Sequence, residues 1–253
     1  MIRTGHSTPR RARACLGAAL LAALLSVRPA AAEEPPSYVV LASTVPDLAV
    51  GALIDEDMML DVPRGASLTL IDPLGAIKVI EGPFMGKLRT NVEDEAEPSF
   101  LHDLANIIAV TDTTDVALGM GRTTLAPEVS PWLVALEPGM PQDLCVSPRG
   151  QLVFYRSEPG PEDMTVRFAA ADGGAQVRVH WSARDPLMRW PDNLPPEDGG
   201  QYVIDIGDAD KQAATLHLAP ASLATDAHAA VWLARHGCME QAQAMVRRMA
   251  LGG

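Results

Sequence analysis

Short apolar runs, each closed by a glycine or proline turn, are the feature that most constrains the fold of this chain. Between residues 62 and 84, Gly65, Gly75 and Gly82 each end a run of strand-like residues. A phosphate-binding loop needs its glycines together between one strand and one helix, usually with a lysine beside a serine or threonine. Because these glycines are spread over three turns, the sequence predicts an antiparallel sheet of short strands.

The second half of the chain repeats the pattern of strands and tight turns. Apolar residues alternate over residues 164–168 and 177–181, on either side of the turn Asp172-Gly173-Gly174. Residues 201–206 and 213–218 flank another turn in the same way. Paired runs of this kind predict hairpins, and several hairpins at regular spacing predict a β-sandwich.

Two segments have helical rather than alternating spacing. Residues 98–109 predict a short amphipathic helix with Ser99 as its N-cap, covering one edge of the first sheet. Near the end of the chain, Thr225 or Asp226 can cap a helix that Gly237 ends, and a second helix follows. The predicted fold is therefore mainly β: an N-terminal antiparallel β meander with a short helix at 38–125, a β-sandwich-like unit at 126–222 and a C-terminal helical hairpin at 223–253.

The first 32 residues have the layout of a cleaved secretory signal. They contain five arginines and no acid, and an apolar run at residues 15–27 precedes Ala30-Ala31-Ala32. That run is shorter than the roughly 20 residues a membrane-spanning helix needs, although an uncleaved anchor stays open as the alternative. We expect cleavage near Ala32, a disordered lead-in at residues 33–37, and a periplasmic or secreted protein with no further membrane segment.

Loss of the signal makes the chain strongly acidic. Of 20 Lys and Arg residues five leave, so 15 remain against 32 Asp and Glu, a net charge of −17. Such a surface repels nucleic-acid phosphates and anionic lipid headgroups, so we expect no nucleic-acid partner. Cys15 also leaves, and the two remaining cysteines, Cys145 and Cys238, are predicted to form a disulfide in an oxidising compartment.

The order of strands and turns in residues 38–88 carries a family resemblance. A strand, Gly51, another strand, Pro63-Arg64-Gly65-Ala66, an apolar run, a glycine turn and a final strand follow one another. This pattern resembles the FecR-like domain of bacterial envelope proteins, and Gly119-Met120-Gly121-Arg122 is similar to a turn that such domains often carry. The rest of the chain resembles other secreted bacterial proteins.

The resemblance implies a β domain in the cell envelope without catalytic residues. Regulatory members of the family also carry a cytoplasmic segment and one membrane span, and they relay a signal from an outer-membrane receptor to a sigma factor. This chain departs from that plan, because it has a predicted signal peptide and no predicted span. The resemblance therefore extends to the domain and not to the signalling role.

No motif in the sequence predicts a catalytic, cofactor or metal site. The zinc-binding pattern HExxH and the serine-nucleophile pattern Gly-x-Ser-x-Gly are both missing. We therefore predict a non-enzymatic envelope protein, without cofactor, that binds or scaffolds a protein partner. Short strands leave sheet edges that can accept a partner strand, and the C-terminal helical hairpin stays open as the alternative contact surface.

Two other functions stay open at this stage. The first is a secreted hydrolase that uses carboxylates near the proline-rich segment 190–198, where Asp192, Glu197 and Asp198 follow Trp190. These four residues form our candidate ligand or partner surface, although for Trp190 closing one end of the sandwich is the preferred interpretation. The second is a metal-dependent sensor, which would hold stoichiometric zinc or calcium.

Overall fold

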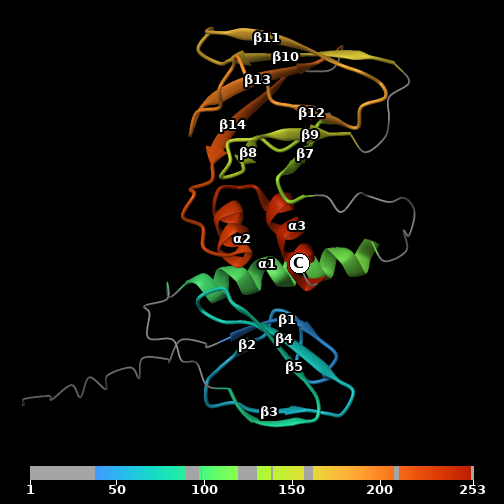
Figure 1. Ribbon diagram of the computed structural model, residues 1–253, viewed down its shortest axis with the longest axis vertical. Coiled ribbons are helices and arrows are strands. Elements are labelled where there is room, and N and C mark those ends of the chain that lie inside the picture. The colour runs from blue at the N-terminus through green and yellow to red at the C-terminus, as the bar shows by residue number, and fades with distance from the viewer. Residues whose placement is uncertain are drawn as a thin grey trace, which may run out of the picture. The chain divides into compact units, whose positions relative to one another are not determined.

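The computed structural model describes residues 38–88, 97, 99–118, 130–137, 139–156, 162–207 and 211–251, with the side chains of 112–118 left out (Figure 1). The predicted signal at residues 1–32, the lead-in at 33–37 and the glycine turn at 119–122 lie outside these residues. Within them, no helix has both the length and the apolar character needed to cross a membrane.

The N-terminal strands form two antiparallel sheets. The larger has the order β2-β1-β4-β5, and in the smaller β3 pairs with β6. These strands span Tyr38–Ser43 (β1), Leu53–Ile54 (β2), Met59–Val62 (β3), Ser67–Ile71 (β4), Ile77–Glu81 (β5) and Phe84–Lys87 (β6). The predicted antiparallel pairing is present, but β3 leaves the meander to pair with β6 instead of lying between β2 and β4.

Glycine turns separate these strands, as predicted. Gly65 lies between β3 and β4 and Gly75 between β4 and β5, both with positive φ, the region that suits glycine. In the second turn, Asp72 Oδ1 accepts hydrogen bonds from the backbone N–H groups of Leu74 and Ala76, at 2.9 Å each. The turn thus fixes the register of β5 against β4.

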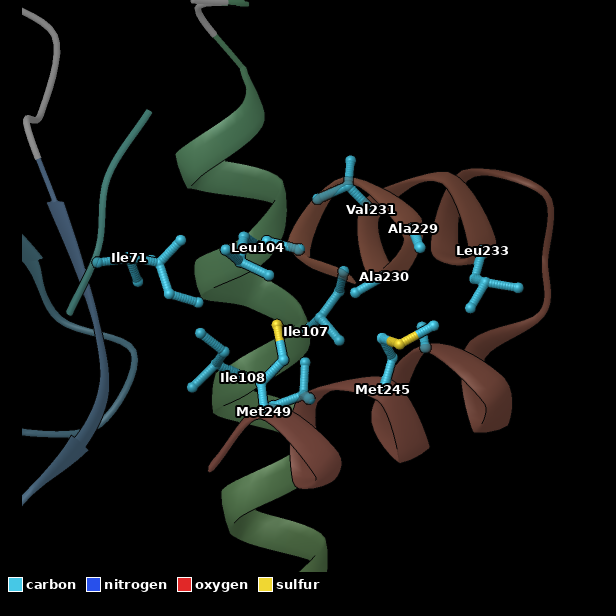
Figure 2. Close-up of a cluster of buried hydrophobic side chains, with 14 of the residues drawn as sticks. Ile71, Leu104, Ile107, Ile108, Ala229, Ala230, Val231, Leu233, Met245 and Met249 are labelled. Atoms are coloured by element: carbon cyan, nitrogen blue, oxygen red, sulfur yellow. The ribbon is translucent and has the colours of Figure 1, made fainter. Parts of the chain in front are cut away.

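The helix α1 (Phe100–Leu118) covers one face of the larger sheet. Its residues Leu104 and Ile108 are fully buried in a cluster with Val39 of β1 and Ile71 of β4, and Figure 2 shows Ile71 directed toward the helix. Our prediction was wrong about its extent, because the helix runs nine residues beyond Ala109. It contacts β1 and the edge strand β2, and Ile71 of β4 belongs to the same buried cluster. The apolar face of β1 and β4 needs this cover.

The C-terminal strands form two sheets around one hydrophobic cluster. The larger has the order β11-β10-β13-β14-β8 and the smaller β12-β9-β7. Their strands are Leu133–Ala135 (β7), Asp143–Val146 (β8), Val153–Tyr155 (β9), Met164–Ala170 (β10), Gln176–Trp181 (β11), Leu187–Arg189 (β12), Gln201–Ile206 (β13) and Gln212–Leu218 (β14). Both predicted hairpins, β10–β11 and β13–β14, are confirmed. The parallel pairs β14–β8 and β7–β9 were not predicted.

The last two helices form the predicted hairpin, which completes a mainly β fold with three helices. Helix α2 (Asp226–Arg235) begins at Thr225, whose side chain accepts a hydrogen bond from His228 N–H. Gly237, with positive φ, ends it, and α3 (Met239–Ala250) follows. Figure 2 shows Ala230 and Met249 in one buried cluster with α1.

Candidate functional site

Trp190 belongs to the core of the C-terminal sandwich. Its ring lies 5.0 Å from the rings of Phe168 and Tyr202, centroid to centroid, in edge-on arrangements. The indole N–H donates to the backbone carbonyl of Leu194. A buried tryptophan needs a partner for its N–H, and the proline-rich turn supplies one. Trp190 therefore closes the sandwich and is not a ligand platform.

The three carboxylates that follow Trp190 lie on the surface. Asp192, Glu197 and Asp198 are all exposed. Asp198 Oδ1 accepts a hydrogen bond from Leu218 N–H at 2.9 Å, so this side chain anchors the turn to the end of β14. A carboxylate pair for hydrolysis needs a shared pocket that excludes water from at least one group. Nothing in the geometry of these residues favours a hydrolase.

The open edge of β5 is the strongest candidate for a binding site. Gly82 N–H donates to Ala66 O at 2.9 Å, and Asp72 N–H donates to Ala76 O at 3.0 Å. Bonded and non-bonded pairs alternate along an antiparallel ladder, so Lys78 and Ile80 direct their backbone groups toward β4. The N–H and C=O groups of Ile77, Val79 and Glu81 therefore point away from the sheet.

The side chains of this edge strand are unusually apolar for exposed positions. Ile77 is 47% exposed and Val79 is 61% exposed, on the same face of β5. Exposed edge strands are normally short, charged or interrupted by proline, because an open row of backbone groups invites pairing with another chain. β5 has five residues and no proline; it carries the charges of Lys78 and Glu81, but its two exposed apolar side chains leave it available to an incoming strand.

The unit that contains β5 has more acidic than basic residues. Burial raises the pKa of Tyr38, which lies beneath Lys78, and the carboxylates of Asp72 and Glu56 raise that pKa further. Residues 38–88 contain seven Asp and Glu against three Lys and Arg. An incoming segment with basic residues is therefore favoured over an acidic one.

The edge strands β12 and β11 of the C-terminal sandwich differ from β5. Strand β12 also exposes an apolar side chain, since Leu187 is 47% exposed, but it has only three residues, with Pro186 directly before it and Pro191 two positions after its end. Strand β11 is longer, and Arg178 on it is exposed. Because Ala170 N–H bonds Ala175 O, the alternation along β10 and β11 directs the backbone groups of Arg178 outward. Arg178 thus places a charge beside the outward backbone groups of β11, as Glu81 does on β5.

The remaining outer strand of the larger C-terminal sheet, β8, is closed by a side chain. The amide of Gln241 accepts a hydrogen bond from Cys145 N–H at 3.2 Å and donates to Cys145 O at 3.1 Å. It also donates to Pro131 O at 3.0 Å. Gln241 is 7% exposed, and its amide takes the place of a neighbouring strand.

The predicted disulfide is confirmed at the same place. Cys145 of β8 and Cys238, the residue before α3, are bonded with a Cα–Cα distance of 6.1 Å. The bond joins positions 93 residues apart in the sequence. It therefore ties the helical hairpin covalently to the sandwich.

The histidines of the helical hairpin have separate surroundings. The ring of His228 stacks on Phe100 at 4.5 Å, and burial lowers its pKa against the opposing effect of Glu97 and Asp72. His236 stacks instead on Trp232 and approaches His217 of β14. In the part of the chain that the structure describes, no group of three or more His, Cys, Asp or Glu side chains is placed to hold a metal ion.

Three of these features were missed in the sequence. The open edge of β5, the Gln241 amide and the approach of His217 to His236 all depend on contacts between distant segments. In the sequence, only Ile77 and Val79 indicate the open edge of β5. They alternate with Lys78 in a predicted strand that ends at a proline turn. In comparisons with known proteins, no protein-family model matches the chain and no curated protein matches it.

Proposed function

We propose that this protein is a secreted or periplasmic binding protein that holds an envelope partner by adding a strand of that partner to β5. The observation that carries the proposal is the outward row of backbone groups at Ile77, Val79 and Glu81, beside two exposed apolar side chains. Main-chain hydrogen bonds supply affinity in strand addition, and side chains of alternate residues supply specificity.

Charge favours a basic segment as the occupant. The net charge of −17 for the chain without its first 32 residues opposes the approach of a second copy. An extended segment can pair with the backbone groups of β5, place apolar residues beside Ile77 and Val79, and place a lysine or arginine near the carboxylate of Glu81. The FecR-like resemblance of residues 38–88 agrees with an envelope role for this unit, and the predicted signal at 1–32 agrees with its export.

Site-specific photo-crosslinking in the native envelope tests this proposal. A photoreactive amino acid is placed at Ile77 or, as the matched control, at Leu187, which has the same 47% exposure on a proline-flanked strand. We expect one discrete partner product from position 77 and none from position 187. Mass spectrometry should locate the crosslink in a basic, extended segment of that partner.

A proline pair separates strand addition from other contacts. Val79→Pro removes an outward N–H and leaves the hydrogen bonds to β4 intact, so the fold should persist while the crosslink disappears. Arg178→Pro makes the equivalent change on β11 and should leave the crosslink unchanged. Equal products from positions 77 and 187, or a crosslink that survives Val79→Pro, would exclude binding through this edge.

A further inference from the structure

Two histidine rings from consecutive elements, β14 and α2, meet close to the disulfide. His217 lies on β14 and His236 is the C-cap of α2, and their ring centroids are 5.1 Å apart with the planes inclined by 57°. The side chain of His217 is 20% exposed, so solvent reaches the pair. Neither residue has a part in the strand-addition site.

Hydrogen bonds fix which nitrogen of each ring carries the proton. His217 Nε2 lies 2.9 Å from Asp143 Oδ1, and His236 Nδ1 lies 2.8 Å from the backbone carbonyl oxygen of Trp232. An ionised carboxylate and a carbonyl only accept hydrogen bonds, so each of these nitrogens donates. In the neutral rings, His217 Nδ1 and His236 Nε2 therefore keep their lone pairs.

Each ring thus makes the kind of hydrogen bond that metal-ligating histidines usually make. A ligating imidazole usually donates its other N–H to a carboxylate or a backbone carbonyl, which sets the tautomer and orients the ring. Asp143 does so for His217, and Trp232 O does so for His236. Two neutral imidazoles suit zinc, copper or nickel, whereas calcium and magnesium prefer oxygen ligands.

The surrounding structure holds the two rings in place. His217 is the register partner of Cys145 in the parallel pair β14–β8, and Cys238 follows His236 by two residues. The Cys145–Cys238 bond thus links β8, the neighbour of the strand that carries His217, to the segment that carries His236. His236 is further fixed by stacking on Trp232, with 4.3 Å between centroids.

We propose that His217 and His236 together bind one divalent transition-metal ion at the junction of the sandwich and the helical hairpin. Since no third protein ligand joins them in the described residues, water completes the coordination sphere. Two protein ligands make a modest site, which responds to the supply of metal rather than holding it permanently.

Calorimetric titration of the full, disulfide-bonded chain with Zn²⁺ after chelator treatment tests the site. We expect one Zn²⁺ per chain and binding at least tenfold weaker in His217→Asn and in His236→Asn. The matched control is His180→Asn, because His180 Nε2 also lies near a carboxylate, 3.3 Å from Asp163 Oδ2, on the same sheet. That variant should bind Zn²⁺ as the unchanged protein does.

A spectroscopic measurement on the unchanged protein keeps the test independent of folding in the variants. With one equivalent of Cu²⁺, electron paramagnetic resonance should show coupling to two imidazole nitrogens. The proposal is overturned if no Zn²⁺ binds, if both His217→Asn and His236→Asn bind normally, or if the copper spectrum shows one nitrogen or none. Equal weakening in His180→Asn would also overturn it, because the effect would then be general.

Discussion

The two large sheets of this protein differ in their edge strands. The N-terminal sheet leaves β5 open, with apolar Ile77 and Val79 exposed along its edge. The C-terminal sheet ends at β8, where the Gln241 amide occupies the backbone groups of Cys145, and at β11, where Arg178 is exposed. Since β5 carries Lys78 and Glu81 as β11 carries Arg178, the two edges differ chiefly in the exposed apolar side chains Ile77 and Val79 of β5.

The same two sheets also meet the helices differently. One face of the N-terminal sheet packs against α1 in an apolar cluster that contains Val39, Leu41 and Ile71. The C-terminal sheet contributes only Cys145 to that cluster among the described residues, and it is held by a disulfide and an amide. Apolar burial distributes stability over many residues, whereas the second attachment concentrates it in two side chains.

Removal of the disulfide should have the largest effect. Replacing Cys145 and Cys238 together by alanine frees a loop that spans 93 positions, which corresponds to about 3 to 5 kcal/mol in the chain-entropy treatment. Guanidinium unfolding measures the loss. Hydrogen exchange should show faster opening of α3 and β8 than of α1 and β1, and equal acceleration in both places would contradict a concentrated attachment.

Gln241→Leu should have the next largest effect. The substitution keeps the side-chain size but leaves the buried N–H and C=O of Cys145 without their partner, a cost of about 2 to 3 kcal/mol. Gln243→Leu, two residues away on α3 and half-buried, is the control and should change the free energy of unfolding by much less. If the two variants unfold alike, the amide of Gln241 does not close the edge of β8.

Much of the fold could be predicted from local pattern. Alternation of apolar residues identified β10, β11, β13 and β14, and Thr225 and Gly237 bounded α2. The length of α1 could not be predicted from Ala109 onward, because Val110 and Thr111 are β-branched and favour strands. In the structure Thr111 Oγ1 donates to Ile107 O at 2.8 Å, which gives this buried hydroxyl a partner inside the helix.

The candidate sites could be predicted far less well. Counting cysteines in a chain with a predicted export signal was sufficient for the Cys145–Cys238 pair. The Gln241 amide meets Cys145 across 96 positions, and no local pattern marks such a contact. Strand order likewise decides which edge is open. β4 pairs with β1 on one side and with β5 on the other, so β5 is the outermost strand.

A charge on the open edge should change association with little effect on stability. Val79→Lys places the charge on an exposed side chain whose backbone groups already point outward, so we expect a change within about 0.5 kcal/mol. Binding of the crosslinked partner segment should weaken, because a basic strand then meets a lysine. Leu187→Lys on β12 is the control. Equal weakening by both would show that net charge acts and not the edge of β5.

The smallest effect concerns the attachment of the N-terminal sheet. The β4–β5 turn at Gly75 packs against Thr225 and His228, and burial lowers the pKa of His228 from its ordinary value near 6.5. Below about pH 6.5 the unfolded chain takes up this proton before the folded chain does, so the free energy of unfolding falls as the pH falls. His228→Gln should make that decline shallower between about pH 6.5 and 5 in urea unfolding, while the exposed control His102→Gln keeps it. An unchanged decline in His228→Gln would mean that the contact of this turn with α2 does not depend on a neutral imidazole.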